Sequence, residues 1–235
     1  MVDVQLSHVA WPKTHRLVMS HFPPIDLFDD LADPRDWEVL AVAQSRTNPR
    51  IYEEIGDLSL VPVERRLSGE GASWVMAAFT HISTDRTSRF SDGTFGVYYA
   101  GDSLETALRE HTFHLSRFYR DAATEPGWIS EVRQLVGTVD TDLVDLRGPG
   151  FASLLDPDIA RYPLPQSFAL EQKALERNGI VYPSLRHDGG ECIAIFYPDA
   201  VSPPVQADHY RYHWNGDRVD FAQQLSGDRE ILELV

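Results

Sequence analysis

The sequence predicts an α+β protein whose core is a curved sheet of mixed or antiparallel strands with helices packed around it. Strand-like runs of β-branched and aromatic residues recur between Gly and Pro clusters, and they outnumber the helical segments. Helical spacing of apolar residues is confined to a few segments, of which 104–115 is the most regular. Near the end, 209–221 holds two alternating strands around Asn-Gly, which is the usual sequence of a hairpin. Strands and helices that are not strictly alternating are typical of the α+β class.

The first third of the chain is predicted to contain short elements separated by Pro and Gly. Asp33 suits the cap of a helix whose first position is Pro34. Gly56 is placed to end a shorter helix. The expected elements are a strand at 12–20, helices at 33–44 and 49–55, an extended segment at 58–63, a turn at 68–71 and a buried strand or short helix at 74–82.

The segment 88–114 is predicted to organise the rest of the chain. A loop carries Arg89, a short aromatic strand ends at Tyr99, and a helix after a Gly-Asp turn delivers Glu110. Glu110 lies beside the apolar stripe of that helix rather than opposite it. A carboxylate, a cation and a phenol therefore meet at a strand-to-helix corner, which predicts a reaction site there.

The elements after residue 100 follow from caps and turns. Asp102 or Ser103 is expected to cap the helix N-terminus. Asn178-Gly179 is expected to stop a later helix that Pro165 opens. The remaining predicted elements are strands at 128–136 and 139–146 that meet near Gly137, a helix at 165–178, strands at 180–182 and 192–197, and the hairpin at 209–221.

Composition limits the class of protein. A chain of 235 residues with 43% hydrophobic and 24% charged residues suits one large soluble domain. We expect no membrane association, because no apolar run is long enough to span a bilayer and the N-terminal residues lack a signal-peptide pattern. The single cysteine, Cys192, excludes an internal disulfide, so we expect a cytoplasmic protein.

The formal net charge of −15 argues against direct binding of nucleic acid, which requires clustered Lys and Arg. It leaves room for a nucleotide ligand, which needs only one or two local cations. A basic protein partner also suits this charge, and solubility alone would explain it.

Several motifs in this order resemble the RES domain, a family of bacterial toxins that pair with Xre-like antitoxins and is named for an Arg, a Glu and a Ser. The segments are RFSDGTFGVYYAGDSLETALRE, which begins at Arg89, and the later GIVYPSLR and CIAIFYP. The spacing of eleven between Tyr99 and Glu110 and the segment that ends at Ser184 match the family pattern. SGEGA at 68–72 resembles a further family segment, and THRLV places Arg16 where the family has its first Arg.

The chain departs from the usual family pattern in length and in one aromatic residue. Phe90 stands where the family has Trp, and the sequence between residues 72 and 89 is expanded. These features resemble the longer subgroup that includes the toxin ParT. The resemblance implies a single RES domain over 1–235, with an elaboration at about 21–66 inserted between the first strand and the rest of the core.

The resemblance implies a fold like that of diphtheria-toxin-type ADP-ribosyltransferases, with NAD+ as substrate. Members transfer ADP-ribose to a protein, phosphoribosyl pyrophosphate synthetase in the case of ParT, or they degrade NAD+ by phosphorolysis or hydrolysis. The implied partners are an Xre-like, ParS-type antitoxin and a protein acceptor of ADP-ribose. A different class of function, an inactive module that only binds the antitoxin, remains as an alternative.

The resemblance assigns roles to five residues, and His81 is added as a candidate ligand contact beside the alternative of a satisfied core histidine. Cleavage of the nicotinamide–ribose bond develops positive charge at the ribose C1′, and Glu110 is the carboxylate expected beside it. Arg89 and Tyr99 complete the expected catalytic set. NAD+ contacts are expected from the two arginines, which suit a pyrophosphate, and from three further side chains, and the full binding set is Arg16, Arg89, Tyr99, Ser184 and His81.

Two other readings of the same residues receive less support. The pattern Glu110-His111-x-x-His114 suggests zinc, but His111 also belongs to the apolar stripe, so we expect no metal site. The chain has no G-x-G-x-x-G motif, so a Rossmann mode of NAD+ binding is not expected. Without the resemblance, Glu110 and Arg89 would be ordinary surface residues and Tyr99 a core aromatic residue.

Overall fold

Eight strands form one strongly curved sheet in the computed structural model of the chain, which describes residues 4–30, 32–48, 50–85 and 87–234. The sheet order is β1-β2-β5-β4-β3-β6-β7-β8, and β1 also pairs with β3. Neighbouring strands are antiparallel except for β3 and β4, which are parallel. The strands are β1 (Leu6–Met19), β2 (Tyr98–Gly101), β3 (Gly127–Asp145), β4 (Gly179–Pro183), β5 (Glu191–Ile195), β6 (Val205–Trp214), β7 (Val219–Gln224) and β8 (Ile231–Glu233).

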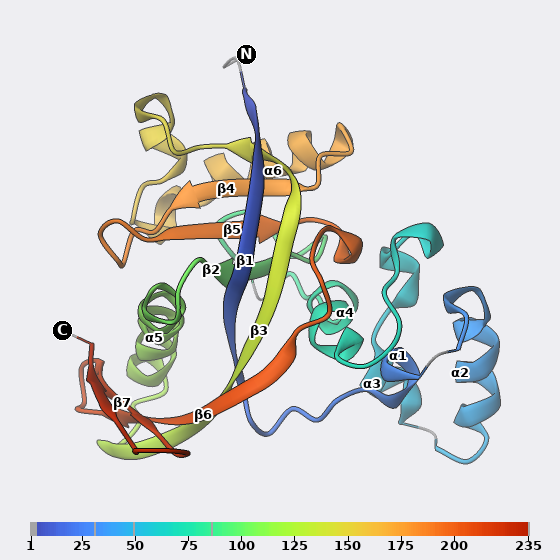
Figure 1. Cartoon of the computed structure of the whole chain (residues 1–235), viewed down its shortest axis with the longest axis horizontal. Coiled ribbons are helices and arrows are strands. Elements are labelled where there is room, and N and C mark those ends of the chain that lie inside the picture. The colour runs from blue at the N-terminus through green and yellow to red at the C-terminus, as the bar shows by residue number, and fades with distance from the viewer. Residues whose placement is uncertain (1–3, 31, 49, 86, 235) are drawn as a thin grey trace.

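The strands β1, β2, β5, β4 and β3 close into a ring, because β1 pairs with both β2 and β3. In Figure 1, the long strands β1 and β3 cross over the three shorter ones. The pairing of β1 with β3 extends along almost all of β1, from Leu6 to Met19. The pairing of β1 with β2 consists of a single residue pair, His15 with Gly101. The ring is therefore weakly joined at this second seam.

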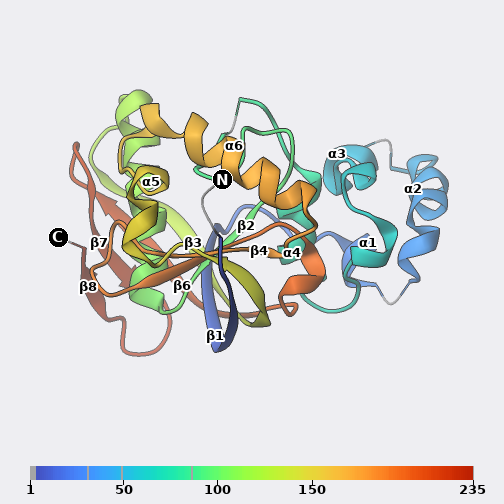
Figure 2. The ribbon, with the colours of Figure 1, turned by 90° about the horizontal axis from the view of Figure 1, so that it is seen from above.

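The helices lie outside the sheet. Figure 1 shows α1, α2 and α3 together at one side of the molecule and α5 at the other, where it contacts β1, β2 and β7. In Figure 2, α6 lies in the upper part of the picture, β2 and β4 in the middle and β1 in the lower part. None of the helices in the described part of the chain is long and apolar enough to cross a membrane. They are α1 (Asp26–Asp29), α2 (Trp37–Ser45), α3 (Ile51–Ile55), α4 (Ala72–Thr80), α5 (Leu104–Asp121) and α6 (Pro163–Ala174).

The α+β class with a curved, largely antiparallel sheet and outer helices is confirmed. Several local predictions are confirmed as well, because their signals are local. Gly56 ends α3 with a φ of 70°, which favours glycine. Ser103 caps α5 by accepting a hydrogen bond from the Thr106 amide. The hairpin with Asn215-Gly216 at its turn is formed by β6 and β7.

Other local predictions are wrong. The segment 58–63 is not extended but contains 3-10 turns at Leu58–Leu60 and Val63–Arg65. The strands expected on either side of Gly137 are one continuous strand, β3. Gly137 does not end a strand there. A Cβ at this position would lie 3.3 Å from the Ser202 carbonyl oxygen. The glycine therefore lets the backbone at Ser202 pass close to β3.

Two further differences concern the second half of the chain. The helix expected at 165–178 begins at Pro163 and ends at Ala174. The chain leaves the helix before Asn178, and Glu176 adopts a φ of 57°. The edge strand β8 has no counterpart in the sequence prediction. The apolar segment at 74–82 was predicted as either a buried strand or a short helix. It belongs to the helix α4, which ends at Thr80.

The apolar side chains of the elaboration share a core with the sheet. Phe28 and Trp37 are fully buried, and their rings pack at an angle of 45° with the centroids 5.0 Å apart. They belong to one continuous cluster with Val139 of β3 and Ile193 of β5. Burial of aromatic side chains of this size is a large source of stability. The stretch 21–66 therefore packs as part of the molecule's main core.

Candidate functional site

A cavity of about 490 Å³ lies along the weak seam between β1 and β2, where α5 forms one wall. Four arginines of the described chain line it, and they are Arg16, Arg89, Arg117 and Arg186. The lining carboxylates are those of Glu110 and Asp85. None of the four arginines forms an ion pair with a carboxylate among the described residues. In a chain of net charge −15 this cavity is a local concentration of positive charge that suits an anionic ligand.

Glu110 enters this cavity from α5, two turns after the cap at Ser103. Its Oε1 accepts hydrogen bonds from the Ser184 hydroxyl at 2.6 Å and from the Leu185 amide at 3.2 Å. The Cys192 thiol lies 3.9 Å from the same oxygen. Within the described chain all of these bonds go to Oε1. The carboxylate is thus held by one oxygen, and the other is left for a ligand.

Arg16 lies in the middle of β1 and reaches across the seam. Its Nη1 donates to the Tyr99 carbonyl oxygen at 2.9 Å, and its guanidinium carbon lies 4.6 Å from the centroid of the Tyr98 ring. Its Nε is buried and has no hydrogen-bond partner in the described part of the chain. Burial lowers the pKa of Arg16, although an arginine stays charged at neutral pH. An unpaired N–H of a buried cation beside a cavity suits a bound anion.

Arg89 lies in the loop before β2 and is 8% exposed. One nitrogen of its guanidinium, Nη1, donates to the Asp156 carbonyl oxygen at 2.7 Å. The guanidinium carbon lies 4.7 Å from the centroid of the Tyr162 ring. Both contacts fix the plane of the guanidinium while the residue lines the cavity. A planar fork held in this way can bind a phosphate through two donors.

Tyr99 connects β2 to the loop that carries Arg89. Its hydroxyl oxygen lies 2.9 Å from the Ser88 hydroxyl oxygen and accepts a hydrogen bond from the Phe90 amide at 3.1 Å. Burial raises the pKa of Tyr99 to about 12, so the phenol is neutral at physiological pH. Tyr99 lines the cavity, but its hydroxyl holds the Arg89 loop instead of pointing to a ligand.

The structure brings most of the predicted site residues together. Arg16, Arg89, Tyr99 and Glu110 line one cavity, and Ser184 bonds to Glu110 from behind it. His81 lies elsewhere.

His81 follows α4, where its ring nitrogens lie 3.1 Å from the Thr80 hydroxyl oxygen and 3.2 Å from the Glu53 carbonyl oxygen. It lines a smaller cavity of about 140 Å³ and not the one that contains Glu110.

The site residues expected from the sequence did not include Arg117 or Arg186, and His114 was considered there only as a metal ligand. His114 and Arg117 lie on α5, four and seven residues after Glu110, so they share its helix face. This spacing was a usable signal. Arg186 comes from the loop after β4, and its guanidinium carbon lies 3.4 Å from the centroid of the Phe113 ring. Its place depends on how that loop packs on α5, which no local pattern reveals.

His111 also lines the cavity, and its burial favours the neutral imidazole. Its Nδ1 lies 3.1 Å from the Tyr212 hydroxyl oxygen. Burial, with the charge of Arg16 second, lowers the pKa of His111 to about 4 from 6.5. Between pH 6.5 and 4 the unfolded chain therefore binds a proton at this residue that the folded chain does not.

We expect the free energy of unfolding to fall as the pH is lowered through this window, by up to about 1.4 kcal/mol per pH unit from His111 alone. Urea unfolding of the wild type and of His111→Gln at pH 7, 6, 5 and 4 measures this contribution. The variant should show the shallower loss of stability. If the free energy of unfolding depends on pH equally in the two proteins, the buried neutral state of His111 is contradicted.

Comparison with known proteins gives matches to a family model, to a bacterial protein and to a solved structure. A model of the RES domain matches residues 63–215. The chain is 26% identical over 210 residues to "Uncharacterized protein y4oC" of Sinorhizobium fredii (strain NBRC 101917 / NGR234), covering 87% of this chain and 84% of that protein. The MbcT–MbcA toxin–antitoxin complex of M. tuberculosis contains a chain that aligns over 90% of this chain and 87% of its own length, with 11% identity and a TM-score of 0.42. Because the family match covers well over half of its residues, the chain belongs to the RES domain family.

Proposed function

We propose that this protein cleaves NAD+ and acts as the toxin of a bacterial toxin–antitoxin pair. The observation that carries the proposal is Glu110, whose carboxylate is held through one oxygen in a cavity with four arginines that have no carboxylate partner in the described chain. NAD+ combines a pyrophosphate with a cationic leaving group on a ribose, so it needs both kinds of charge in one site. Membership of the RES domain family supports the same substrate.

The mechanism assigns Glu110 to the ribose and the arginines to the phosphates. Departure of nicotinamide develops positive charge at the ribose C1′, and the Glu110 carboxylate stabilises that charge. Its Oε2 is placed to accept a hydrogen bond from a ribose hydroxyl. Arg16 and Arg89 bind the pyrophosphate, Arg89 through its fixed fork and Arg16 through its unpaired Nε. The ring of Tyr99 offers a stacking surface for the nicotinamide.

The leading acceptor is a protein, so the reaction is ADP-ribosyl transfer that arrests growth. The resemblance to the ParT subgroup makes phosphoribosyl pyrophosphate synthetase the target to test first. None of the residues described within 21–66 lines the cavity. If this elaboration selects the target, it does so through a surface outside the cavity.

A second acceptor, inorganic phosphate, has one observation in its favour. Arg16 and Arg89 suffice for a pyrophosphate, while Arg117 and Arg186 also line the cavity. The additional positive charge would suit a phosphate that attacks C1′, which makes the enzyme an NAD+ phosphorylase. Water in the same place would make it a glycohydrolase.

The proposed partner is an Xre-like antitoxin of the ParS type, and the proposed site of action is the cytoplasm. Family membership supports this pairing. An inactive module that only binds its antitoxin is the competing function. Isothermal titration separates the two, because an active toxin binds NAD+ and the inactive module binds only the partner.

Radiolabelled NAD+ tests the proposal and its acceptor together. Purified protein is incubated with NAD+ in buffer, with added phosphate and with a bacterial lysate, and Glu110→Ala is run beside it. Label on one lysate protein, only with the intact enzyme, is the expected result. Loss of NAD+ without labelled protein points to phosphorolysis or hydrolysis, according to whether phosphate is required. No loss of NAD+ in any reaction refutes the proposed activity.

A further inference from the structure

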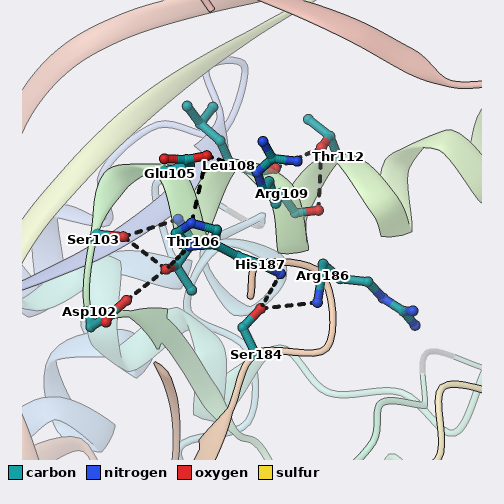
Figure 3. Close-up of polar contacts among 10 residues, drawn as sticks. All are labelled: Asp102, Ser103, Glu105, Thr106, Leu108, Arg109, Thr112, Ser184, Arg186 and His187. Atoms are coloured by element: carbon teal, nitrogen blue, oxygen red, sulfur yellow. Dashed lines mark hydrogen bonds and ion pairs between the residues drawn. The ribbon is translucent and has the colours of Figure 1, made fainter. Parts of the chain in front are cut away.

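A chain of hydrogen bonds runs from the first turn of α5 to Ser184, in the loop after β4 (Figure 3). The Thr106 hydroxyl donates to Asp102 Oδ1 at 2.7 Å, and its oxygen lies 2.9 Å from His187 Nδ1. The His187 amide donates to Ser184 Oγ at 3.0 Å. Ser184 Oγ donates in turn to Glu110 Oε1 at 2.6 Å. The proposed catalytic carboxylate is thus connected to residues outside the cavity.

The Thr106 hydroxyl has three partners, and the Asp102 carboxylate among them can only accept. With the single Thr106 proton directed at Asp102, the Thr106 oxygen accepts from the Ser103 hydroxyl, 2.8 Å away, and from His187 Nδ1. His187 therefore carries a proton on Nδ1. Thr106 is fully buried, and a buried hydroxyl with all its bonds formed is a rigid anchor. His187 Nε2 faces the more exposed Glu105, at 3.6 Å from its Oε1.

The proton direction at the Ser184 end is fixed in the same way. Ser184 Oγ accepts from the amides of Arg186 at 3.2 Å and His187 at 3.0 Å, which fill its two lone pairs. Its own proton is left to point at Glu110. Because both amides belong to the turn 184–187, the direction of the Ser184 hydroxyl depends on the shape of that turn.

Gly190 provides independent evidence that this turn is docked on α5. A Cβ at Gly190 would lie 2.4 Å from Thr106 Oγ1 and 2.7 Å from His187 Nδ1. The Gly190 carbonyl also accepts from the Ser184 amide at 2.8 Å. Only a residue without a side chain lets the loop approach closely enough for Thr106 and His187 to meet.

We propose that Thr106 and His187 are positioning residues that hold Glu110 in its reactive orientation through Ser184. Their contact closes the turn 184–187 onto α5, and this directs the Ser184 hydroxyl and the Leu185 amide at Oε1 of Glu110. The other oxygen of Glu110 is then free to meet the ribose. Neither Thr106 nor His187 lines the cavity, so they act on it only through the turn that carries Leu185 and Arg186. The inference rests on the proposed role of Glu110.

Paired substitutions on each side of the contact test it. Thr106→Val removes the hydroxyl and Thr106→Ser keeps it, while His187→Ala removes the ring and His187→Asn keeps a donor near the position of Nδ1. We expect kcat for NAD+ cleavage to fall about tenfold in Thr106→Val and His187→Ala, with a smaller change in KM for NAD+. Thr106→Ser and His187→Asn should recover most of the loss. Wild-type kcat in the first two variants, or a loss not recovered in the second two, would overturn the inference.

A second measurement does not depend on activity. Hydrogen exchange followed by NMR reports the Leu185 amide, which donates to Glu110 in the closed turn. It should exchange about tenfold faster in His187→Ala than in the wild type, and His187→Asn should restore its protection. Unchanged exchange overturns the positioning role even if the protein is active. If the wild type itself does not cleave NAD+ while the exchange rates change as expected, the proposed function is refuted and the positioning contact stands.

Discussion

Replacing Glu110 with Gln is expected to lower kcat for NAD+ cleavage by about 10³-fold and to leave KM for NAD+ nearly unchanged. The amide can still accept the Ser184 and Leu185 hydrogen bonds at Oε1, so the local structure persists. It carries no charge to stabilise the cation at C1′, and loss of one electrostatic partner at such a site costs roughly 10²–10³-fold or more. Initial rates at varied NAD+ measure both constants.

A matched control is Glu171→Gln, which neutralises an exposed carboxylate on α6 outside the cavity. It should behave as the wild type in the same assay. In cells, Glu110→Gln should abolish growth inhibition while the control remains toxic. Full toxicity of Glu110→Gln would remove Glu110 from the mechanism and leave the partner-binding function as the better account.

Replacing Arg89 with Met is expected to raise KM for NAD+ by about 10- to 100-fold, because a charge-assisted hydrogen bond is worth roughly 1.5–3 kcal/mol. Met keeps a side chain of similar length against the Tyr162 ring but offers no donor to the pyrophosphate. The KM of Arg89→Lys should lie between those of the wild type and Arg89→Met, since an ammonium group keeps the charge but lacks the planar fork. Isothermal titration with NAD+ and steady-state kinetics measure the change.

The buried position of Arg89 requires a check of stability. Its substitution leaves the Asp156 carbonyl oxygen without a donor, so urea unfolding must show that the variant is folded under assay conditions. Arg161→Met, an exposed arginine on the neighbouring turn, is the control and should leave KM unchanged. Equal KM values for Arg89→Met and the wild type would show that Arg89 has only a structural role.

The parts of the site that sequence predicted are those set by local rules. The cap at Ser103 and the apolar stripe fix the start and the face of α5, and together they aim Glu110 inward. The loop that carries Arg89 is likewise close in sequence to Tyr99, which holds it. Arg186 was missed because its place depends on the docking of a loop more than seventy residues away from α5's first turn.

The fold shows the same division. Turns and caps predicted the hairpin and the start of α5, whereas the closure of the ring could not be predicted. The pairing of β1 with β3 and its single contact with β2 depend on tertiary packing. A glycine at position 137 suggested a break between two strands. The strand is continuous, and the close approach of Ser202 explains why the residue is glycine. The segment 58–63 has strand-like composition but folds into turns over the core.

The closure of the ring sets the earliest point during synthesis at which the cavity can be assembled. Arg16 leaves the ribosome early, but its partner in β3 is Leu135, which is made 119 residues later. At the usual 5–20 residues per second this is a delay of roughly 6 to 24 s. The last strand of the ring, β5, follows at Glu191–Ile195. A nascent chain therefore carries no assembled site until most of it has been translated.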